Sequence, residues 1–257
     1  MKKVWIVGGL VAASLALGTL IVAGHDLLTP PDAAPGKARS SGLPWQVDSL
    51  PGGASKVMGL TLAPSGSTLG SASGSMQVAS TLADAQQQWG QAMQIAIIAA
   101  PGEDGLLEAF VDPASAGFIT GKVIITAQLP NAEIRAMRER AIKSEFMEST
   151  TRKYTLTPAD LQTALKAPIT ALSFIPQANL DADTVVARFG TPAERVRSNG
   201  HLEHFLYPAK GLDLALDSEG KELLQYVAPA EFDKLLQPLM KPAAASASSA
   251  LTSASQP

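Results

Sequence analysis

The segment that decides the fold is Leu180–Val227, which reads LDADTVVARFGTPAERVRSNGHLEHFLYPAKGLDLALDSEGKELLQYV. Asp181 is a favourable N-cap residue and Gly190 is a favourable C-terminal stop, so a helix is expected between them. Short apolar runs separated by turn residues follow the helix and predict antiparallel strands. These strands are expected at residues 202–208, 211–217 and 222–227. The order is therefore a capped helix followed by a β-meander.

A degenerate copy of this order precedes it in the chain. Three pairs of segments match in pattern: Met58–Pro64 with Thr170–Pro176, Thr81–Gly90 with Asp181–Gly190, and Leu107–Pro113 with Leu202–Pro208. The last pair shares Leu, Glu, Phe and Pro, and a further strand is expected after Leu107–Pro113, at residues 117–127. We interpret the chain as an α+β protein of two tandem repeats, at 45–150 and 151–241. Chance similarity between segments of α+β composition is the alternative.

Two helices are expected between the matched segments. Residues 131–149 predict a long amphipathic helix, with Glu139 and Lys143 as a favourable i,i+4 pair. Its apolar stripe consists of Ile134, Met137, Ala141, Ile142, Phe146 and Met147. A shorter helix is expected at residues 158–166, where Thr157 is the cap and Pro158 occupies the first helical position.

The N-terminal residues 1–28 predict a membrane anchor. Two lysines precede the uncharged residues 4–24, which are long enough to cross a bilayer, whereas a secretory signal has an apolar core of only about 7–15 residues. The positive-inside rule keeps the lysines in the cytoplasm and places the rest of the chain in the periplasm. We expect a single-pass inner-membrane protein. Secretion after cleavage near Gly24 is the alternative.

Low-complexity stretches flank the part expected to fold. Residues 29–44 contain four prolines and few large apolar side chains, so they predict an extended linker. Residues 242–257 are almost entirely Ala, Ser, Pro and Thr, and they predict a disordered tail. Residues 64–75 are rich in Ser and Gly and predict a loop. They lack the Gly-Lys-Ser/Thr ending of a phosphate-binding loop.

The second unit resembles the small outer-membrane-assembly lipoprotein family, chiefly over residues 179–228. In that family a helix ends in Gly-x-Pro, here Gly190-Thr191-Pro192, and a three-stranded meander follows. The tandem arrangement also resembles the β-lactamase-inhibitor-protein fold, which presents a sheet face to partners. These resemblances imply a binding or assembly role in the periplasm and bring no catalytic residues. The chain departs from the lipoproteins because it contains no Cys to carry a lipid.

Composition and motifs exclude several kinds of function. The 257 residues carry 20 Lys and Arg against 23 Asp and Glu, which argues against nucleic acid as a partner. The lack of Cys excludes disulfides, thiolate catalysis and Cys-based metal sites. His201 and His204 are three residues apart on an expected strand, so their side chains should leave opposite faces and not share a metal. No serine has an obvious His and Asp around it. We predict no catalytic residues, metal or cofactor.

The candidate partner-binding residues lie on matched strands of the two units. They are Glu203, Phe205 and Tyr207 in the second unit and Glu108 and Phe110 in the first. Strand alternation places each set on one face of the sheet. If the opposite face packs on the helices, these aromatic and acidic side chains are available to a partner. If loops or the other repeat cover them, they are core residues.

Three functions are compatible with these patterns. The first is a membrane-anchored periplasmic module, not an enzyme, that binds or scaffolds another envelope protein. The second is binding of a lipid or small apolar ligand, which a large apolar cavity would indicate. The third is an envelope hydrolase, which a polar pocket with a perturbed pKa would indicate. The patterns favour the first function, and they do not identify the partner or the oligomeric state.

Overall fold

The computed structural model describes residues 42–66, 79–90, 93–147, 150–198 and 200–240. The expected membrane segment, most of the linker, the tail and much of the Ser/Gly-rich loop lie outside these residues, so these expectations stay predictions. Within the described ranges, none of the helices is long and apolar enough to span a bilayer. The class is α+β with antiparallel sheets, as the sequence predicted.

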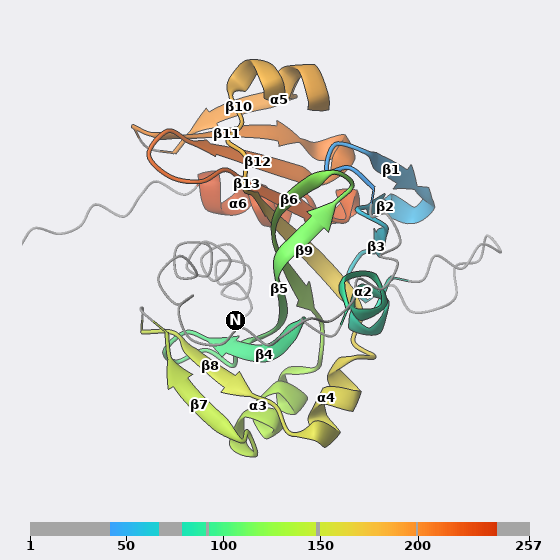
Figure 1. Ribbon diagram of the computed structural model, residues 1–257, viewed down its shortest axis with the longest axis vertical. Coiled ribbons are helices and arrows are strands. Elements are labelled where there is room, and N and C mark those ends of the chain that lie inside the picture. Colours follow the sequence, from blue (N-terminus) through green and yellow to red (C-terminus); the bar gives the residue numbers. More distant parts are fainter. Residues whose placement is uncertain (1–41, 67–78, 91–92, 148–149, 199, 241–257) are drawn as a thin grey trace, which may run out of the picture.

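One curved sheet of ten strands forms the centre of the fold, with every neighbouring pair antiparallel (Figure 1). Its spatial order is β10-β11-β12-β13-β9-β6-β5-β4-β8-β7. The strands are β4 (Gln94–Ala99), β5 (Leu106–Ala116), β6 (Ile119–Ala127), β7 (Lys143–Phe146), β8 (Arg152–Thr155), β9 (Ile169–Pro176), β10 (Glu194–Arg197), β11 (Leu202–Tyr207), β12 (Leu212–Asp217) and β13 (Leu223–Val227).

Strand β9 joins the two halves of the sheet, and β8, from the second predicted unit, pairs with β4 and β7 of the first. Strand β9 pairs with β6 on one side and with β13 on the other. Its sequence, ITALSFIP, is almost wholly apolar, which is typical of a strand that is buried on both faces. In each half a capped helix precedes the meander, α2 (Leu82–Trp89) before β4-β5-β6 and α5 (Ala182–Phe189) before β10-β11-β12-β13. Descent of the two halves from one repeated unit stays a prediction.

A small three-stranded sheet lies beside the large one. It consists of β1 (Val47–Leu50), β2 (Ala54–Val57) and β3 (Leu60–Leu62). Met58 and Gly59 turn the chain between β2 and β3 with positive φ angles of 47° and 84°. The Gln88 side chain on α2 donates a hydrogen bond of 2.7 Å to the Met58 carbonyl, which fixes this turn against the helix.

The predicted helix caps are present. The α-helices are α2 (Leu82–Trp89), α3 (Asn131–Glu139), α4 (Pro158–Ala164), α5 (Ala182–Phe189) and α6 (Asp233–Met240), and the 3₁₀ helices are Pro51–Gly53, Pro208–Lys210 and Pro229–Glu231. Thr81 and Asp84 form a reciprocal capping box at the start of α2. Asp181 accepts a 2.7 Å hydrogen bond from the Thr184 backbone at the start of α5, and this bond lowers the Asp181 pKa.

The long helix predicted for residues 131–149 is wrong. Helix α3 ends at Glu139, and residues 143–146 form strand β7, which pairs with β8. Ile134 and Met137 are buried as predicted, whereas Ile142 and Phe146 are 65% and 67% exposed. The helical spacing of apolar residues continues past Glu139, but the backbone of residues 143–146 forms its hydrogen bonds with β8 instead of with another helical turn.

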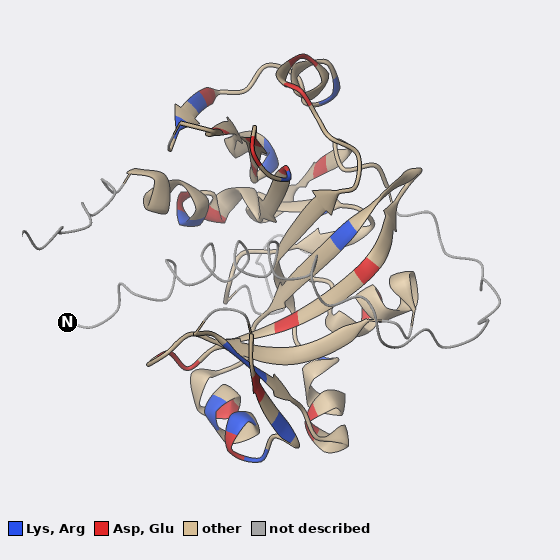
Figure 2. Ribbon diagram, turned by 60° about the vertical axis from the view of Figure 1, so that its left-hand side comes forward, with Lys and Arg blue, Asp and Glu red and all other residues tan. Residues whose placement is uncertain are grey.

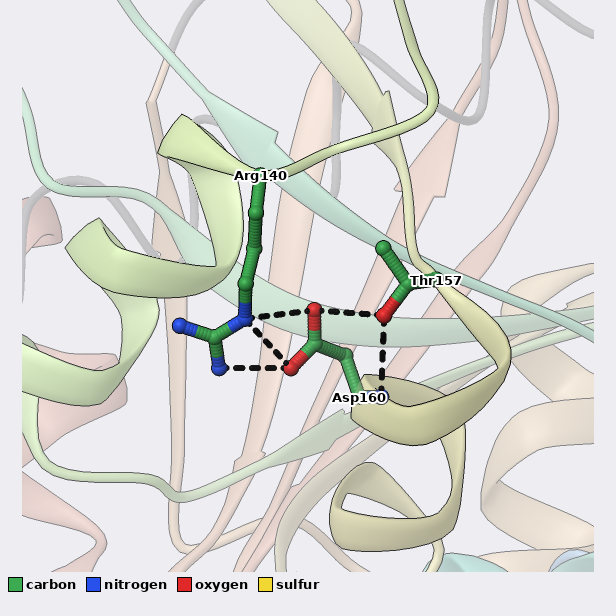
Figure 3. A network of polar contacts seen from close by, with 3 residues as sticks. All are labelled: Arg140, Thr157 and Asp160. Atoms are coloured by element: carbon green, nitrogen blue, oxygen red, sulfur yellow. Dashed lines mark hydrogen bonds and ion pairs between the residues drawn. The ribbon is translucent and has the colours of Figure 1, made fainter.

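An ion pair fixes the point where α3 ends (Figure 3). The Arg140 guanidinium donates to both carboxylate oxygens of Asp160 at 2.6 to 3.0 Å, and Thr157 donates its hydroxyl to the same carboxylate at 2.8 Å. Asp160 is 3% exposed, and its pairing with Arg140 holds its pKa below the ordinary value. The network therefore ties the C-terminus of α3 to the capped start of α4.

The sheet has apolar residues on both faces. On one face, Phe174 and Leu224 pack in a large core together with helices α2 and α5. On the other face, Leu206 and Val227 pack against Leu235 of α6. Charged residues gather on the helices and on the strands near the two ends of the sheet, whereas the central strands carry few (Figure 2). Both faces of the sheet therefore have to be shielded from water by other segments of the chain.

Candidate functional site

Phe205 and Tyr207 lie on β11 and were predicted to stand on an open face, but both are buried. Their exposed fractions are 0% and 5%, and both belong to the large core. The prediction that this part of the sheet is open to a partner is therefore wrong, and the core alternative holds for the two rings.

Helix α5 is the element that covers this face. The Phe189 ring centroid lies 6.1 Å from that of Tyr207. The Tyr207 hydroxyl donates a 2.9 Å hydrogen bond to the carbonyl of Gly190, the residue that ends the helix. Burial raises the pKa of this phenol. Strand alternation placed the two rings on one face correctly, but it could not show that α5 returns over that face.

Glu203, the third predicted residue on β11, is held by a neighbouring strand. Its carboxylate accepts two hydrogen bonds from Arg195 on β10, at 3.0 and 3.1 Å. The same guanidinium lies 4.3 Å from the centroid of the Phe205 ring. Arg195 thus packs on the Phe205 ring and also neutralises Glu203. The glutamate is therefore part of an ion pair between two neighbouring strands at the edge of the sheet.

The first-unit residues Glu108 and Phe110 are brought together in a small cavity. They lie on β5, where Glu108 is 3% exposed and Phe110 is half-buried. The cavity has a volume of about 140 Å³, and its other lining residues are Gln94, Ala96, Ile98, Met147 and Lys153. Among the described residues, neither carboxylate oxygen of Glu108 has a hydrogen-bond partner, and burial raises its pKa to about 8.

A larger cavity of about 540 Å³ lies on the opposite face, beside the large core. Four aromatic residues from separate segments line it: Trp45 before β1, Phe118 in the β5–β6 turn, Phe174 on β9 and Phe189 on α5. The Trp45 ring meets the rings of Phe118 and Phe189 edge-on, at centroid distances of 6.1 and 6.2 Å. Phe118 is 76% exposed, so one large aromatic stands in solvent at this cavity.

A positively charged side chain, Arg188, lines the same aromatic cavity. The Arg188 guanidinium on α5 is 5.1 Å from the Trp45 ring centroid, and its side chain lines the cavity. Among the described residues, no carboxylate lies within ion-pair distance of Arg188. The cavity therefore offers an apolar wall with one positive charge that is not neutralised by the described part of the chain.

A Ser–His–Asp arrangement, which the sequence did not reveal, connects three strands. The Ser198 hydroxyl lies 3.2 Å from His204 Nε2, and His204 Nδ1 lies 2.9 and 3.0 Å from the two carboxylate oxygens of Asp213. His204 and Asp213 are buried, as expected for a histidine whose ring nitrogens are satisfied locally. Ser198 is exposed and lines neither the aromatic cavity nor the cavity around Glu108.

His201 belongs to a separate pair. Its Nδ1 lies 2.8 Å from Asp217, and this hydrogen bond raises the pKa of the imidazole. His201 and His204 thus contact different aspartates, and within the described ranges no group of three or more acidic or histidine side chains could hold a metal.

No known protein family matches the chain, and neither the curated proteins nor the solved structures include a significant match.

Sequence reasoning missed the aromatic cavity because its residues come from distant segments. The one available signal was Phe118 itself, a large aromatic that directly follows Gly117 where a hairpin turn is needed.

Proposed function

We propose that this protein is a non-enzymatic binding module that captures an apolar segment of another envelope protein in the aromatic cavity. The observation that carries the proposal is the joint placement of Trp45, Phe118 and Arg188 around a cavity of about 540 Å³. Aromatic residues and arginine dominate the binding energy of protein interfaces when they surround a pocket. A solvent-exposed Phe118 favours a protein partner, because a partner surface extends beyond the cavity and can cover that ring.

The charge at the cavity indicates the chemistry of the partner. An apolar side chain can enter the cavity beside Trp45 and Phe189, whose rings are in contact with each other, and pack against the aromatic and aliphatic part of its lining. A carboxylate next to it can meet Arg188, which has no acidic partner in the described part of the chain. The partner segment is thus one large apolar residue adjacent to an acidic residue.

The cellular setting is part of the same proposal. Residues 4–24 anchor the chain in the inner membrane and the folded part lies in the periplasm. The resemblance to the outer-membrane-assembly lipoproteins and to the β-lactamase-inhibitor-protein fold supports a role in envelope assembly, because both resemblances imply protein binding. The linker at residues 29–44 gives the module reach from the membrane surface.

Site-specific photo-crosslinking in cells tests the proposal. Phe118 is replaced by p-benzoylphenylalanine in the full-length chain, and adducts are identified by mass spectrometry. Phe146 on β7 is the matched control position, since it is also a strongly exposed phenylalanine, 67% against 76%, and does not line the cavity. We expect one defined envelope protein at position 118, no such adduct at 146, and weaker capture when Arg188→Glu is added.

Two other outcomes reject the proposal. Adducts at 118 that are the same as those at 146 show a surface without a specific partner. Adducts that consist of lipid or another small molecule support the second candidate function, binding of an apolar ligand, for which a cavity of this volume is also suitable.

A further inference from the structure

The small cavity around Glu108 is a second site, on the face of the sheet opposite the aromatic cavity. Alternation puts Glu108, Ala96 and Ile98 on the face that carries the apolar cluster with Ile124, whereas Phe174 of the aromatic cavity lies on the other. Ligand binding at the two sites is therefore argued separately, and the inference below does not rest on the proposed function.

The polar groups that line this cavity differ in exposure. Gln94 is exposed and Lys153 is half-buried, and the lysine ammonium donates to the Gln94 side-chain oxygen at 3.1 Å. Glu108 is buried, and neither of its oxygens has a hydrogen-bond partner in the described part of the chain. The remaining walls are Ala96, Ile98, Phe110 and Met147. The cavity thus has an apolar wall, the half-buried ammonium group of Lys153, and the Glu108 carboxyl group, which has no hydrogen-bond partner among the described residues.

The chemistry of the buried carboxyl follows from its surroundings. An ionised carboxylate without a hydrogen bond or a counter-ion is strongly disfavoured away from water, so Glu108 is held in its neutral form. A neutral carboxyl group is a hydrogen-bond donor as well as an acceptor. The other titratable group that lines the cavity is Lys153, and Glu145 on β7, which stands opposite Lys153 in the sheet, is bonded to Lys143 at 2.6 Å.

We propose that this cavity binds a small aliphatic carboxylate, whose anionic group lies between the Lys153 ammonium and the hydroxyl of a neutral Glu108. The ligand oxygens accept from both groups, and its alkyl part lies against Ile98 and Phe110. A volume of about 140 Å³ is well below that of drug-sized pockets, so the ligand is a short-chain acid. An ammonium ligand is disfavoured because it meets Lys153 at the mouth.

The test is a binding titration of the full-length protein in nanodiscs with butyrate. Butylammonium and butanol serve as probes of the same chain length, and binding is followed by ligand-observed NMR. We expect butyrate alone to bind at about pH 6.5. At about pH 9.5 only about 3% of Glu108 keeps its proton, given a pKa of about 8, so the apparent affinity should fall about 30-fold.

Two variants separate this mechanism from a structural effect. Glu108→Gln keeps a donor that cannot ionise, so it should bind butyrate equally at both pH values. Lys153→Met should weaken binding at least about tenfold at the lower pH, whereas Lys56→Met, on the separate small sheet, should not. Tighter binding of butylammonium than of butyrate, absence of butyrate binding, or an unchanged pH dependence in Glu108→Gln each overturns the proposal.

Discussion

The buried carboxyl of Glu108 should make the protein less stable as the pH rises through the neutral range. Its pKa is raised from 4.5 to about 8 in the folded protein because burial removes water from both oxygens. Between these two values the unfolded chain has released the proton and the folded chain retains it. Stability falls with pH in such a window, because the native state binds more protons than the unfolded state.

The magnitude follows from the size of the pKa difference. Each pH unit inside the window removes about 1.4 kcal/mol from the free energy of unfolding. Raising the pH from about 5 to about 7.5 therefore costs about 3 kcal/mol through this one residue. Glu108→Gln removes the ionisation while nearly keeping the shape, so the variant should lack this slope, whatever constant offset its buried amide introduces.

Urea unfolding of the full-length protein in mild detergent, at a series of pH values, measures the effect. The quantity to compare is the difference in free energy of unfolding between the wild type and Glu108→Gln, since the histidines titrate equally in both chains and cancel. Glu203→Gln is the matched control, because that carboxylate is paired with Arg195 and more exposed. Parallel pH curves for the wild type and Glu108→Gln would refute the assignment of a neutral buried glutamate.

Three further predictions concern stability. Phe205→Ala should cost about 3–5 kcal/mol in urea unfolding because the ring is fully buried, whereas Phe118→Ala should change stability by less than about 0.5 kcal/mol. Tyr207→Phe should cost about 1 kcal/mol, the worth of the hydrogen bond to the end of α5. Arg140→Gln should destabilise the protein near neutral pH, because it leaves buried Asp160 without its cation. The Asp160 pKa is lowered in the folded protein, so the ion pair stabilises the wild type only while Asp160 is ionised. As the pH falls through the folded-state pKa of Asp160, the wild type loses this stabilisation, and the free energies of unfolding of the two chains should become similar.

Helix positions could be predicted where a few adjacent residues determine them. Thr81, Thr157 and Asp181 each cap a helix with their own side chains, and these helices start where the sequence placed them. The same local reasoning failed at residues 131–149. Apolar spacing there continued beyond Glu139, but the backbone of residues 143–146 found its hydrogen bonds in β8, a strand whose position depends on the rest of the sheet.

The sequence predicted which side chains of the candidate site share a face of the sheet, but not whether that face is exposed. Glu108 and Phe110 do share a face and a cavity, and Phe205 and Tyr207 do share a face. Whether a face is covered depends on helices that return from elsewhere in the chain, and α5 covers the two aromatic rings. Strand alternation describes the two sides of one strand only, so it cannot separate an interface from a core.

The aromatic cavity and the cavity around Glu108 lie on opposite faces of a sheet that has apolar side chains on both faces. The central strand β9 contributes Phe174 to one face and Ile175 to the other, and neither side chain can be left in water without cost. The described residues that cover the two faces leave one of these gaps on each face. The gap on the α5 face contains Arg188 and the gap on the other face contains Glu108. Since Arg188 and Glu108 lie on opposite faces, Arg188→Glu should leave butyrate binding unchanged, and Glu108→Gln should leave crosslinking at position 118 unchanged.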